Sequence, residues 1–99
     1  MYTSKFKDLP LVGIMRGISA VHMPAIVETL VKAGLGYVEV TMNTPGAAEI
    51  IREVKRIAGD RMKVGAGTVL STGDLRTALD SGAEFIVTPV MVADVVREC

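Results

Sequence analysis

The sequence predicts an α/β protein of the TIM-type (β/α)8-barrel class, with four N-terminal βα units that form half of a barrel. Four short apolar runs alternate with helix-like segments, and the runs start roughly 20–27 residues apart, which is the spacing of βα units with short loops. The runs are almost continuously apolar, as expected for parallel strands covered on both faces. An open, doubly wound sheet with the same order of elements remains the alternative.

Each predicted strand is followed by a predicted helix. The expected strands are Leu11–Met15, Tyr37–Thr41, Lys63–Gly67 and Phe85–Thr88. Residues 3–8 are expected to form a short leading helix, and residues 90–99 a fourth helix after the last strand. Pro24 is unfavourable inside a helix, so the first long helix either begins near Met23, with Pro24 in its first turn, or is kinked at that position.

Capping residues mark the starts of the second and third helices. Thr44 is a candidate N-cap because Pro45 follows it at the first helical position. Ser71 and Asp74 resemble a capping box, with Asp in the usual place of Glu. The three helices between the strands end at glycines, which favours the short turns of a βα repeat.

Length, charge and cysteine usage narrow the function classes. The 99 residues are expected to form one domain. Eleven basic residues balance eleven acidic ones, so no long-range field favours nucleic acid or an acidic membrane as a partner. Cys99 is the single cysteine, the first eight residues are unlike a signal peptide, and no apolar run approaches the ~20 residues of a membrane span. We therefore expect a cytoplasmic protein.

Polar residues at the carboxyl ends of the predicted strands identify a candidate site, because chemistry in parallel α/β proteins gathers there. Glu39 lies in the middle of an apolar strand, and a carboxylate buried there has a raised pKa that suits a general acid or base. An edge strand with Glu39 in solvent is the alternative. Arg16 and Thr68, at matching positions of the adjacent strands, favour the catalytic interpretation.

Arg16 and Thr68 each have a plausible binding role and a plain structural one. The planar guanidinium of Arg16 could bind a carboxylate or phosphate, or it could be a surface group paired with Glu39. Thr68 follows Gly65-Ala66-Gly67, where the missing side chains let a ligand approach the backbone. A helix-entry or core threonine is the alternative for Thr68.

Four motifs in order resemble the 2-keto-3-deoxy-6-phosphogluconate (KDPG) and 4-hydroxy-2-oxoglutarate (KHG) aldolase family. They are Pro-Leu-Val-Gly-Ile-Met-Arg-Gly (10–17), Val-Glu-Val-Thr-Met-Asn-Thr-Pro (38–45), Val-Gly-Ala-Gly-Thr-Val-Leu (64–70) and Ser-Gly-Ala-Glu-Phe-Ile-Val-Thr-Pro (81–89). The resemblance covers essentially the whole chain. The pair Val-Glu-Val-Thr and Gly-Ala-Gly-Thr-Val is specific, and it favours an aldolase over other phosphate-binding barrels.

The resemblance implies a class I aldolase, usually a homotrimer, that uses no metal or other cofactor. Its substrate is a 2-keto acid: KDPG is cleaved to pyruvate and glyceraldehyde 3-phosphate, or KHG to pyruvate and glyoxylate. A lysine forms a Schiff base with the keto group. Glu39 matches the glutamate that moves protons, and Thr68 matches the threonine that binds the pyruvyl carboxylate. Arg16 matches an arginine near that carboxylate, and Pro89 a proline that walls the pocket.

This sequence departs from the family pattern in two ways. Asn43 stands where many members have the pyruvate-binding arginine, so the positive charge would have to come from Arg16. The Schiff-base lysine of the family lies on strand six, beyond the four units expected here. We therefore expect the N-terminal half of an aldolase, inactive alone and prone to self-association through its apolar outer strands. The alternatives are a self-associating half-barrel that binds a small carboxylate without catalysis, and a related phosphosugar-binding barrel.

Overall fold

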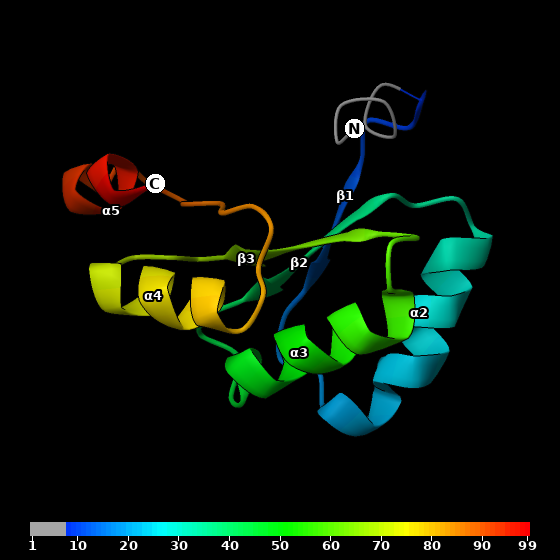
Figure 1. Ribbon diagram of the computed structural model, residues 1–99. Helices are drawn as coiled ribbons and strands as arrows, with labels where there is room; N and C mark the ends of the chain where they lie inside the picture. Colours follow the sequence, from blue (N-terminus) through cyan, green and yellow to red (C-terminus); the bar gives the residue numbers. More distant parts are fainter. Residues whose placement is uncertain (1–7) are drawn as a thin grey trace.

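The computed structural model describes residues 8–99 as an α/β structure (Figure 1). Its elements are β1 (Val12–Met15), the 3-10 helix η1 (Ala20–His22), α2 (Met23–Lys32), β2 (Tyr37–Thr41), α3 (Ala47–Ala58), β3 (Lys63–Gly67), α4 (Thr72–Asp80) and α5 (Ala93–Glu98). The expected leading helix over residues 3–8 falls almost entirely outside the described residues. The predicted alternation is confirmed for the first three strands and the helices that follow them.

The first three predicted strands form one parallel sheet in the order β1-β2-β3. Glu39 is the central residue of this register: it pairs with Ile14 of β1 and with Gly65 of β3. Because paired residues of parallel strands point to the same face, these three positions share one face of the sheet. All three carboxyl ends therefore lie along one edge, where the predicted site residues were expected.

The predicted fourth strand is shorter than expected. Residues 85–88 run parallel to β3 but form one isolated bridge, between Ile86 and Ala66. Two hydrogen bonds hold this bridge, from the Ala66 amide to the Phe85 carbonyl (3.0 Å) and from the Val87 amide to the Ala66 carbonyl (2.8 Å). Backbone hydrogen bonds also join the two segments on either side of the bridge, from the Glu84 amide to the Val64 carbonyl (2.7 Å) and from the Val69 amide to the Val87 carbonyl (3.4 Å), but they do not continue the regular ladder.

Thr44 does not cap α3, contrary to the prediction. The helix begins at Ala47, and its N-cap is Gly46, whose φ of 73° lies in the left-handed region that glycine adopts without strain. The Thr44 hydroxyl instead accepts a hydrogen bond from the amide of Gly17, in the loop after β1. A long-range contact has therefore replaced the local cap that the sequence pattern suggested.

Two other predicted helix starts are confirmed, whereas the helix expected over residues 90–99 spans only Ala93–Glu98. Ser71 is the N-cap of α4, and its hydroxyl accepts a hydrogen bond from the Asp74 amide at 3.0 Å. The first long helix, α2, begins at Met23 with Pro24 in its first turn, where a proline needs no amide partner. Of the two alternatives, the helix that begins near Met23 is therefore correct, and the kinked helix is wrong.

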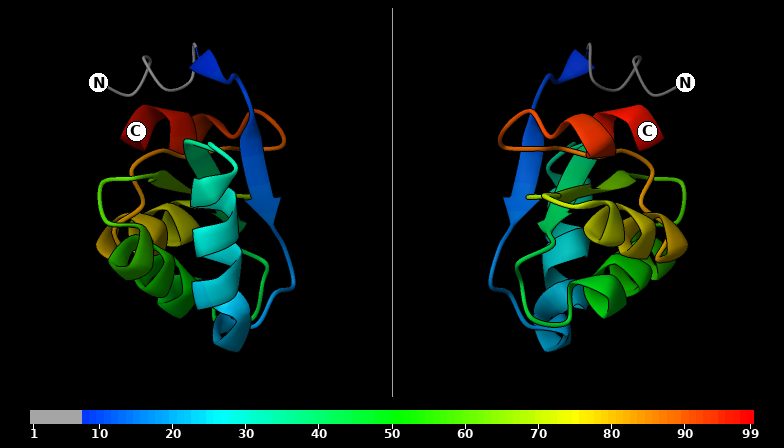
Figure 2. Two further views of the ribbon diagram at one scale, coloured as in Figure 1. Left: turned by 90° about the vertical axis from the view of Figure 1, so that its right-hand side faces the viewer. Right: turned by 90° about the vertical axis from the view of Figure 1, so that its left-hand side faces the viewer.

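Helices α2, α3 and α4 lie on one side of the three strands (Figures 1 and 2). The apolar core fills the space between these layers. The strands contribute the residues that point away from Glu39, and the helices contribute their sheet-facing residues. Its fully buried members include Val27, Val38, Val40, Ile51, Val54, Val64, Ala66 and Leu75. Helix α5 packs on α4 and adds Val95 to the same core. Among residues 8–99, no helix is long and apolar enough to cross a membrane.

Candidate active site

Glu39 lies at the centre of the sheet face that the core does not use. Its residue surface is 6% exposed, although the neighbouring Ile14 on β1 is 63% exposed. The carboxylate lies directly over Gly67, where a Cβ atom would be 2.5 Å from Oε2 and 2.6 Å from Cδ. Because no real side chain fits at that distance, the glycine at 67 provides the space that the Glu39 carboxyl group occupies.

The environment of Glu39 favours its protonated form. Burial raises the pKa of the carboxyl group above its ordinary value, and the positive charge of Arg16 opposes that effect. Among the described residues, Oε2 is buried and has no hydrogen-bond partner. Buried polar atoms are rarely left without a partner, and those that are need an explanation. A carboxyl group that is hidden, unpaired and easily protonated is suited to proton transfer with a bound molecule.

Arg16 and Thr68 meet beside this carboxylate. Arg16 Nη2 donates a hydrogen bond of 3.2 Å to Thr68 Oγ1, across the 52 residues between them in the chain. Arg16 is exposed, and most of its donors remain available. The three residues that sequence reasoning singled out therefore come together at the carboxyl ends of β1, β2 and β3.

Thr68 has a strained backbone. Its φ is +55°, which makes it the single non-glycine residue with a positive φ in the described part of the chain. A β-branched residue in this region is an outlier that costs on the order of 1–3 kcal/mol. In this conformation the Thr68 hydroxyl accepts the hydrogen bond from Arg16, and strained backbone of this kind clusters at functional sites.

Two buried threonines belong to this region and were not predicted as site residues. Thr41 and Thr44 lie at the end of β2, with their hydroxyl oxygens 2.7 Å apart. Thr44 Oγ1 accepts from the Gly17 amide at 2.9 Å, and Thr41 Oγ1 donates to the Met15 carbonyl at 3.5 Å. The sequence did place Thr44 as a polar residue next to a strand end. Because Pro45 follows it, however, Thr44 was interpreted only as the cap of the next helix.

Asn43 and Pro89 occupy the loops at the same edge but lie outside this hydrogen-bonded group. Asn43 is exposed in the turn after β2, and Pro89 is exposed in the bend after residues 85–88. The structure therefore brings together Arg16, Glu39 and Thr68 but does not join Asn43 or Pro89 to them.

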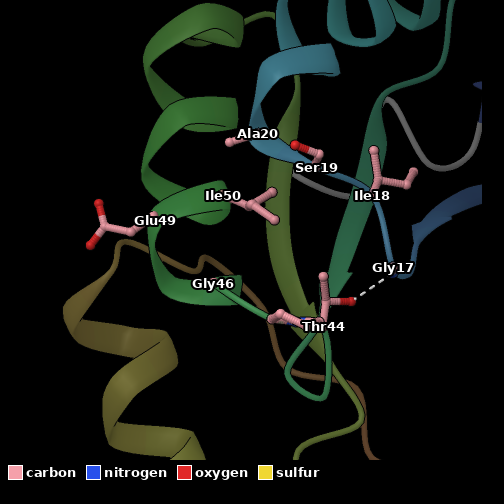
Figure 3. A pocket seen from close by; sticks show the side chains of 9 residues that line it. Gly17, Ile18, Ser19, Ala20, Thr44, Gly46, Glu49 and Ile50 are labelled. Atoms are coloured by element: carbon pink, nitrogen blue, oxygen red, sulfur yellow. Dashed lines mark hydrogen bonds between the residues drawn. The ribbon is translucent and has the colours of Figure 1, made fainter.

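A hollow of about 350 Å³ lies next to this site but is separate from it (Figure 3). It opens between η1 and the first turn of α3, and Ser19, Glu49 and Ile50 are among its lining residues. None of the five predicted site residues lines it. Figure 3 shows the Thr44 side chain bonded to Gly17 at its edge. The part of the hollow that Thr44 and Gly17 line is therefore next to the loops that support the site.

The described lysines lie away from the carboxyl ends of the strands. Lys32 is in the last turn of α2, and Lys55 is in the last turn of α3. Lys63 is the first residue of β3, so it is at the opposite end of that strand from Thr68. Lys55 and Lys63 both pair with Glu84, at 2.9 Å and 3.6 Å. None of the three lysines within residues 8–99 is therefore located beside Glu39.

Comparison with known proteins identifies the family. A family model described as KDPG and KHG aldolase matches residues 2–99. The chain belongs to this aldolase family. The resemblance stated from the four sequence motifs is therefore confirmed, and it covers almost every residue of the chain.

Individual aldolases match over part of their own length. The chain is 35% identical over 89 residues to 2-dehydro-3-deoxy-6-phosphogalactonate aldolase of Escherichia coli (strain K12), which is 90% of this chain and 43% of that protein. It is 46% identical over 69 residues to 2-dehydro-3-deoxy-phosphogluconate aldolase of Zymomonas mobilis (strain ATCC 31821), or 70% of this chain and 32% of that protein. The chain therefore spans less than half the length of these relatives.

Solved aldolase structures share the fold. The structure titled "Native KDPGal structure" superposes with a TM-score of 0.84 at 35% identity, over 90% of this chain and 43% of that one. The KDPG aldolase of Zymomonas mobilis ZM4 with 3-phosphoglycerate gives a TM-score of 0.83 at 35% identity, over 95% and 44%. The α/β fold with its parallel sheet is thus the fold of these aldolases over the matched region.

Proposed function

We propose that residues 1–99 form the N-terminal half of a (β/α)8-barrel aldolase that cleaves KDPG or KHG to pyruvate and an aldehyde. The observation that carries the proposal is the buried Glu39 carboxyl group, with one oxygen unpaired, next to the hydrogen-bonded Arg16 and Thr68. A cation and a hydroxyl suit a carboxylate ligand, and a protonatable group beside them suits chemistry at the neighbouring carbon. Membership of the aldolase family supports this substrate class.

Each residue of the site has a distinct role in this proposal. Arg16 and Thr68 bind the carboxylate of the 2-keto acid through the guanidinium and the hydroxyl group. Glu39 transfers protons to and from the reacting carbon and the departing water, a role that a pKa raised by burial favours. Asn43 and Pro89 complete the pyruvyl pocket from the loops after β2 and after residues 85–88. Arg16 supplies the positive charge that Asn43 does not carry.

The Schiff-base lysine lies outside residues 1–99 in this proposal. We expect that pyruvate with borohydride leaves no stoichiometric covalent adduct on the 99-residue chain, as measured by intact mass. A specific adduct would mean that a lysine of this chain takes the role, and the half-site proposal would then be wrong.

A chimera tests the catalytic role of Glu39. Residues 1–99 would replace the matching region of the E. coli phosphogalactonate aldolase, which is 35% identical over that region. Glu39→Gln should lower kcat about 10²–10⁴-fold, the usual contribution of a positioned acid or base. Glu49→Gln, at an exposed residue paired with Arg52 on α3, is the matched control and should leave kcat unchanged. Equal activity of both variants would remove Glu39 from the mechanism.

A binding protein without catalysis is the second candidate, and the Arg16–Thr68 pair is the observation that favours it, because that pair needs no proton transfer to bind a carboxylate. The chimera distinguishes the two candidates. A chimera that binds pyruvate tightly but turns over no substrate, with Glu39 and Arg16 intact, would support carboxylate binding alone.

We also propose that the protein is a homo-oligomer and that the 99-residue chain self-associates. Leu11, Val12 and Ile14 of the β1 segment are 57%, 38% and 63% exposed, so the outer strand presents apolar side chains and an unpaired edge. Sedimentation at low micromolar concentration is the measurement. A sharp monomer of 10.5 kDa with a cooperative melt would contradict self-association.

A further inference from the structure

Two hydroxyl groups are buried where the loop after β1 meets the turn after β2. The described residues include four buried polar side chains, and Thr41 (0% exposed) and Thr44 (5% exposed) are two of them. The Thr44 amide also donates to the Thr41 carbonyl at 3.0 Å, which closes the turn between them. Since α3 is capped by Gly46, neither hydroxyl is needed to start the helix.

The hydroxyl groups of this pair link the two neighbouring segments. The Thr41 and Thr44 hydroxyl oxygens lie 2.7 Å apart, with either one able to donate, and Thr41 Oγ1 also lies at a long 3.5 Å from the Met15 carbonyl. Thr44 Oγ1 in turn accepts from the Gly17 amide at 2.9 Å. A connected hydrogen-bond network therefore links the Gly17 amide, the two hydroxyl groups and the Met15 carbonyl.

The two ends of this hydrogen-bond network lie on either side of Arg16 in the sequence. The Met15 carbonyl belongs to the peptide group before Arg16, and the Gly17 amide belongs to the peptide group after it. β1 ends at Met15, so no strand pairing holds the backbone of Arg16. Its exposed side chain has one hydrogen bond within the described residues, the 3.2 Å contact with Thr68. The position of the guanidinium therefore depends on how the two flanking peptide groups are held.

We propose that Thr41 and Thr44 are positioning residues that clamp both peptide groups of Arg16 and so hold its guanidinium beside Thr68 and Glu39 for a substrate carboxylate. The inference rests on the proposed function for the identity of the ligand, but the clamp itself rests on the hydrogen bonds alone. Thr44 reaches across 27 residues to Gly17 rather than to its own helix, which is the contact that a positioning role requires.

The titration of Glu39 reports where the Arg16 charge lies. Arg16 opposes the upward effect of burial on the pKa of Glu39. Tyr37, the other titratable group on this face of β2, lies two residues toward the opposite end of the strand. In the 99-residue chain, Thr44→Val should raise the titration midpoint of the Glu39 carboxyl carbon, measured by 13C NMR, because the guanidinium moves away. Thr44→Ser keeps the hydroxyl and should retain the wild-type midpoint.

A double-mutant cycle separates positioning from general damage. Arg16→Gln should raise the Glu39 midpoint by at least as much as Thr44→Val, and the double variant should show no further rise. Thr29→Val removes a hydroxyl that bonds Ala25 within α2 and should change nothing at Glu39. If Thr44→Val does not fold, Thr41→Val removes the contacts with Met15 and Thr44 but keeps the Gly17–Thr44 hydrogen bond, and it should give a smaller rise. A folded Thr44→Val or Thr41→Val variant with an unchanged midpoint would overturn the proposal.

Pyruvate affinity gives the second readout. Thr44→Val should weaken pyruvate binding about tenfold, which corresponds to about 1.4 kcal/mol, because a displaced guanidinium loses a charge-assisted contact. Thr44→Ser should restore the affinity. If the wild-type chain binds no pyruvate while the Glu39 midpoint responds as described, the proposed function fails and the clamp stands. If the wild-type chain binds pyruvate normally but the Glu39 midpoint does not change in the Thr41 and Thr44 variants, the clamp proposal fails and the proposed function stands.

Discussion

Two carboxylates lie beside the two ends of β3, Glu84 at the amino end and Glu39 at the carboxyl end, and they differ in how many partners they have. At the amino end, Glu84 pairs with Lys55 and Lys63, and its Oε1 accepts a hydrogen bond from the Val64 amide at 3.2 Å. At the carboxyl end, Glu39 has a buried oxygen with no partner among residues 8–99. The hydrogen-bonding capacity of the first carboxylate is therefore used within the structure, whereas one oxygen of the second is buried without a partner, as the proposed proton-transfer role requires.

The glycines of β3 follow the same division. A Cβ at Gly65 would lie 2.5 Å from the ring of Phe85, which itself packs on Tyr37 with 5.8 Å between ring centroids. A Cβ at Gly67 would meet the Glu39 carboxylate instead. One glycine makes room for a rigid aromatic contact and the other for a movable charged group. Gly65, in the middle of the strand, thus serves packing, whereas Gly67 at its carboxyl end makes room for the proposed catalytic carboxyl group.

The largest difference between the two ends should come from adding one methyl group to each glycine. Gly65→Ala forces a ring out of its packed position and should lower the free energy of unfolding by about 1–3 kcal/mol, the usual cost of overpacking. Gly67→Ala should cost less than about 1 kcal/mol, because the Glu39 side chain can swing away. The pKa of Glu39 should then fall toward its ordinary value as the carboxylate reaches solvent.

Urea unfolding and 13C NMR measure the two effects of the glycine variants. Gly73→Ala, at the start of α4 where a Cβ would meet only Ser71 at 3.7 Å, is the matched control and should be stable. An equal loss of stability at Gly65 and Gly67 would mean that the two ends do not differ.

Neutralising the two carboxylates should change stability in opposite directions. Glu84→Gln removes two ion pairs from a partly buried group and should lower the free energy of unfolding by about 1–2 kcal/mol at pH 7. Glu39→Gln removes a buried charge without a full set of partners, so it should leave stability unchanged or raise it. Chemical unfolding of both variants against wild type checks this, and a destabilised Glu39→Gln would show that the carboxylate has a structural partner.

The pH dependence of stability should separate the same two residues. Opposing its burial, the hydrogen bonds from Lys55 and Val64 and the charges of Lys55 and Lys63 hold the pKa of Glu84 below its ordinary value. Its contribution is therefore present above that value and lost as the pH falls through the folded pKa. Burial raises the pKa of Glu39, so its charge destabilises the fold as the pH rises from the ordinary value through the raised one.

Unfolding experiments from pH 3 to pH 8 on both Gln variants test these slopes. The advantage of Glu39→Gln over wild type should grow with rising pH, while the deficit of Glu84→Gln should shrink with falling pH. Two parallel curves for Glu39→Gln and wild type would argue against a raised pKa at Glu39.

The smallest expected effect concerns the strain at Thr68. Thr68→Gly relieves a left-handed conformation that costs roughly 1–2 kcal/mol, and it adds roughly 0.4–1 kcal/mol of chain entropy to the unfolded state. The variant also removes the hydroxyl that accepts from Arg16, which costs about 0.5–1.5 kcal/mol, so the net change in stability should lie within about 1.5 kcal/mol of zero. Thr29→Gly in α2 should cost about 1 kcal/mol, because that position has no strain to relieve. Equal losses at the two positions would mean that Thr68 is unstrained.

The periodic parts of the molecule were predictable from the sequence. The β2 and β3 strands have the predicted bounds, and the Ser71 cap and the start of α2 at Met23 were also anticipated. These features depend on short-range patterns, such as apolar runs, caps and glycine stops, which act within a few residues. The placement of Glu39 on the face opposite the core follows from the same alternation along β2.

Features that depend on contacts between distant segments were decided by the tertiary structure. Thr44 looked like a helix cap, but its hydroxyl binds Gly17 because the loop after β1 passes beside it. Residues 85–88 looked like a full strand, but they form one bridge with β3, and the flanking backbone hydrogen bonds to Val64 and Val69 do not continue a regular ladder. A local pattern states what a segment can do alone. Which of the available hydrogen bonds forms depends on the partner that packing brings within reach, and only the folded chain determines that partner.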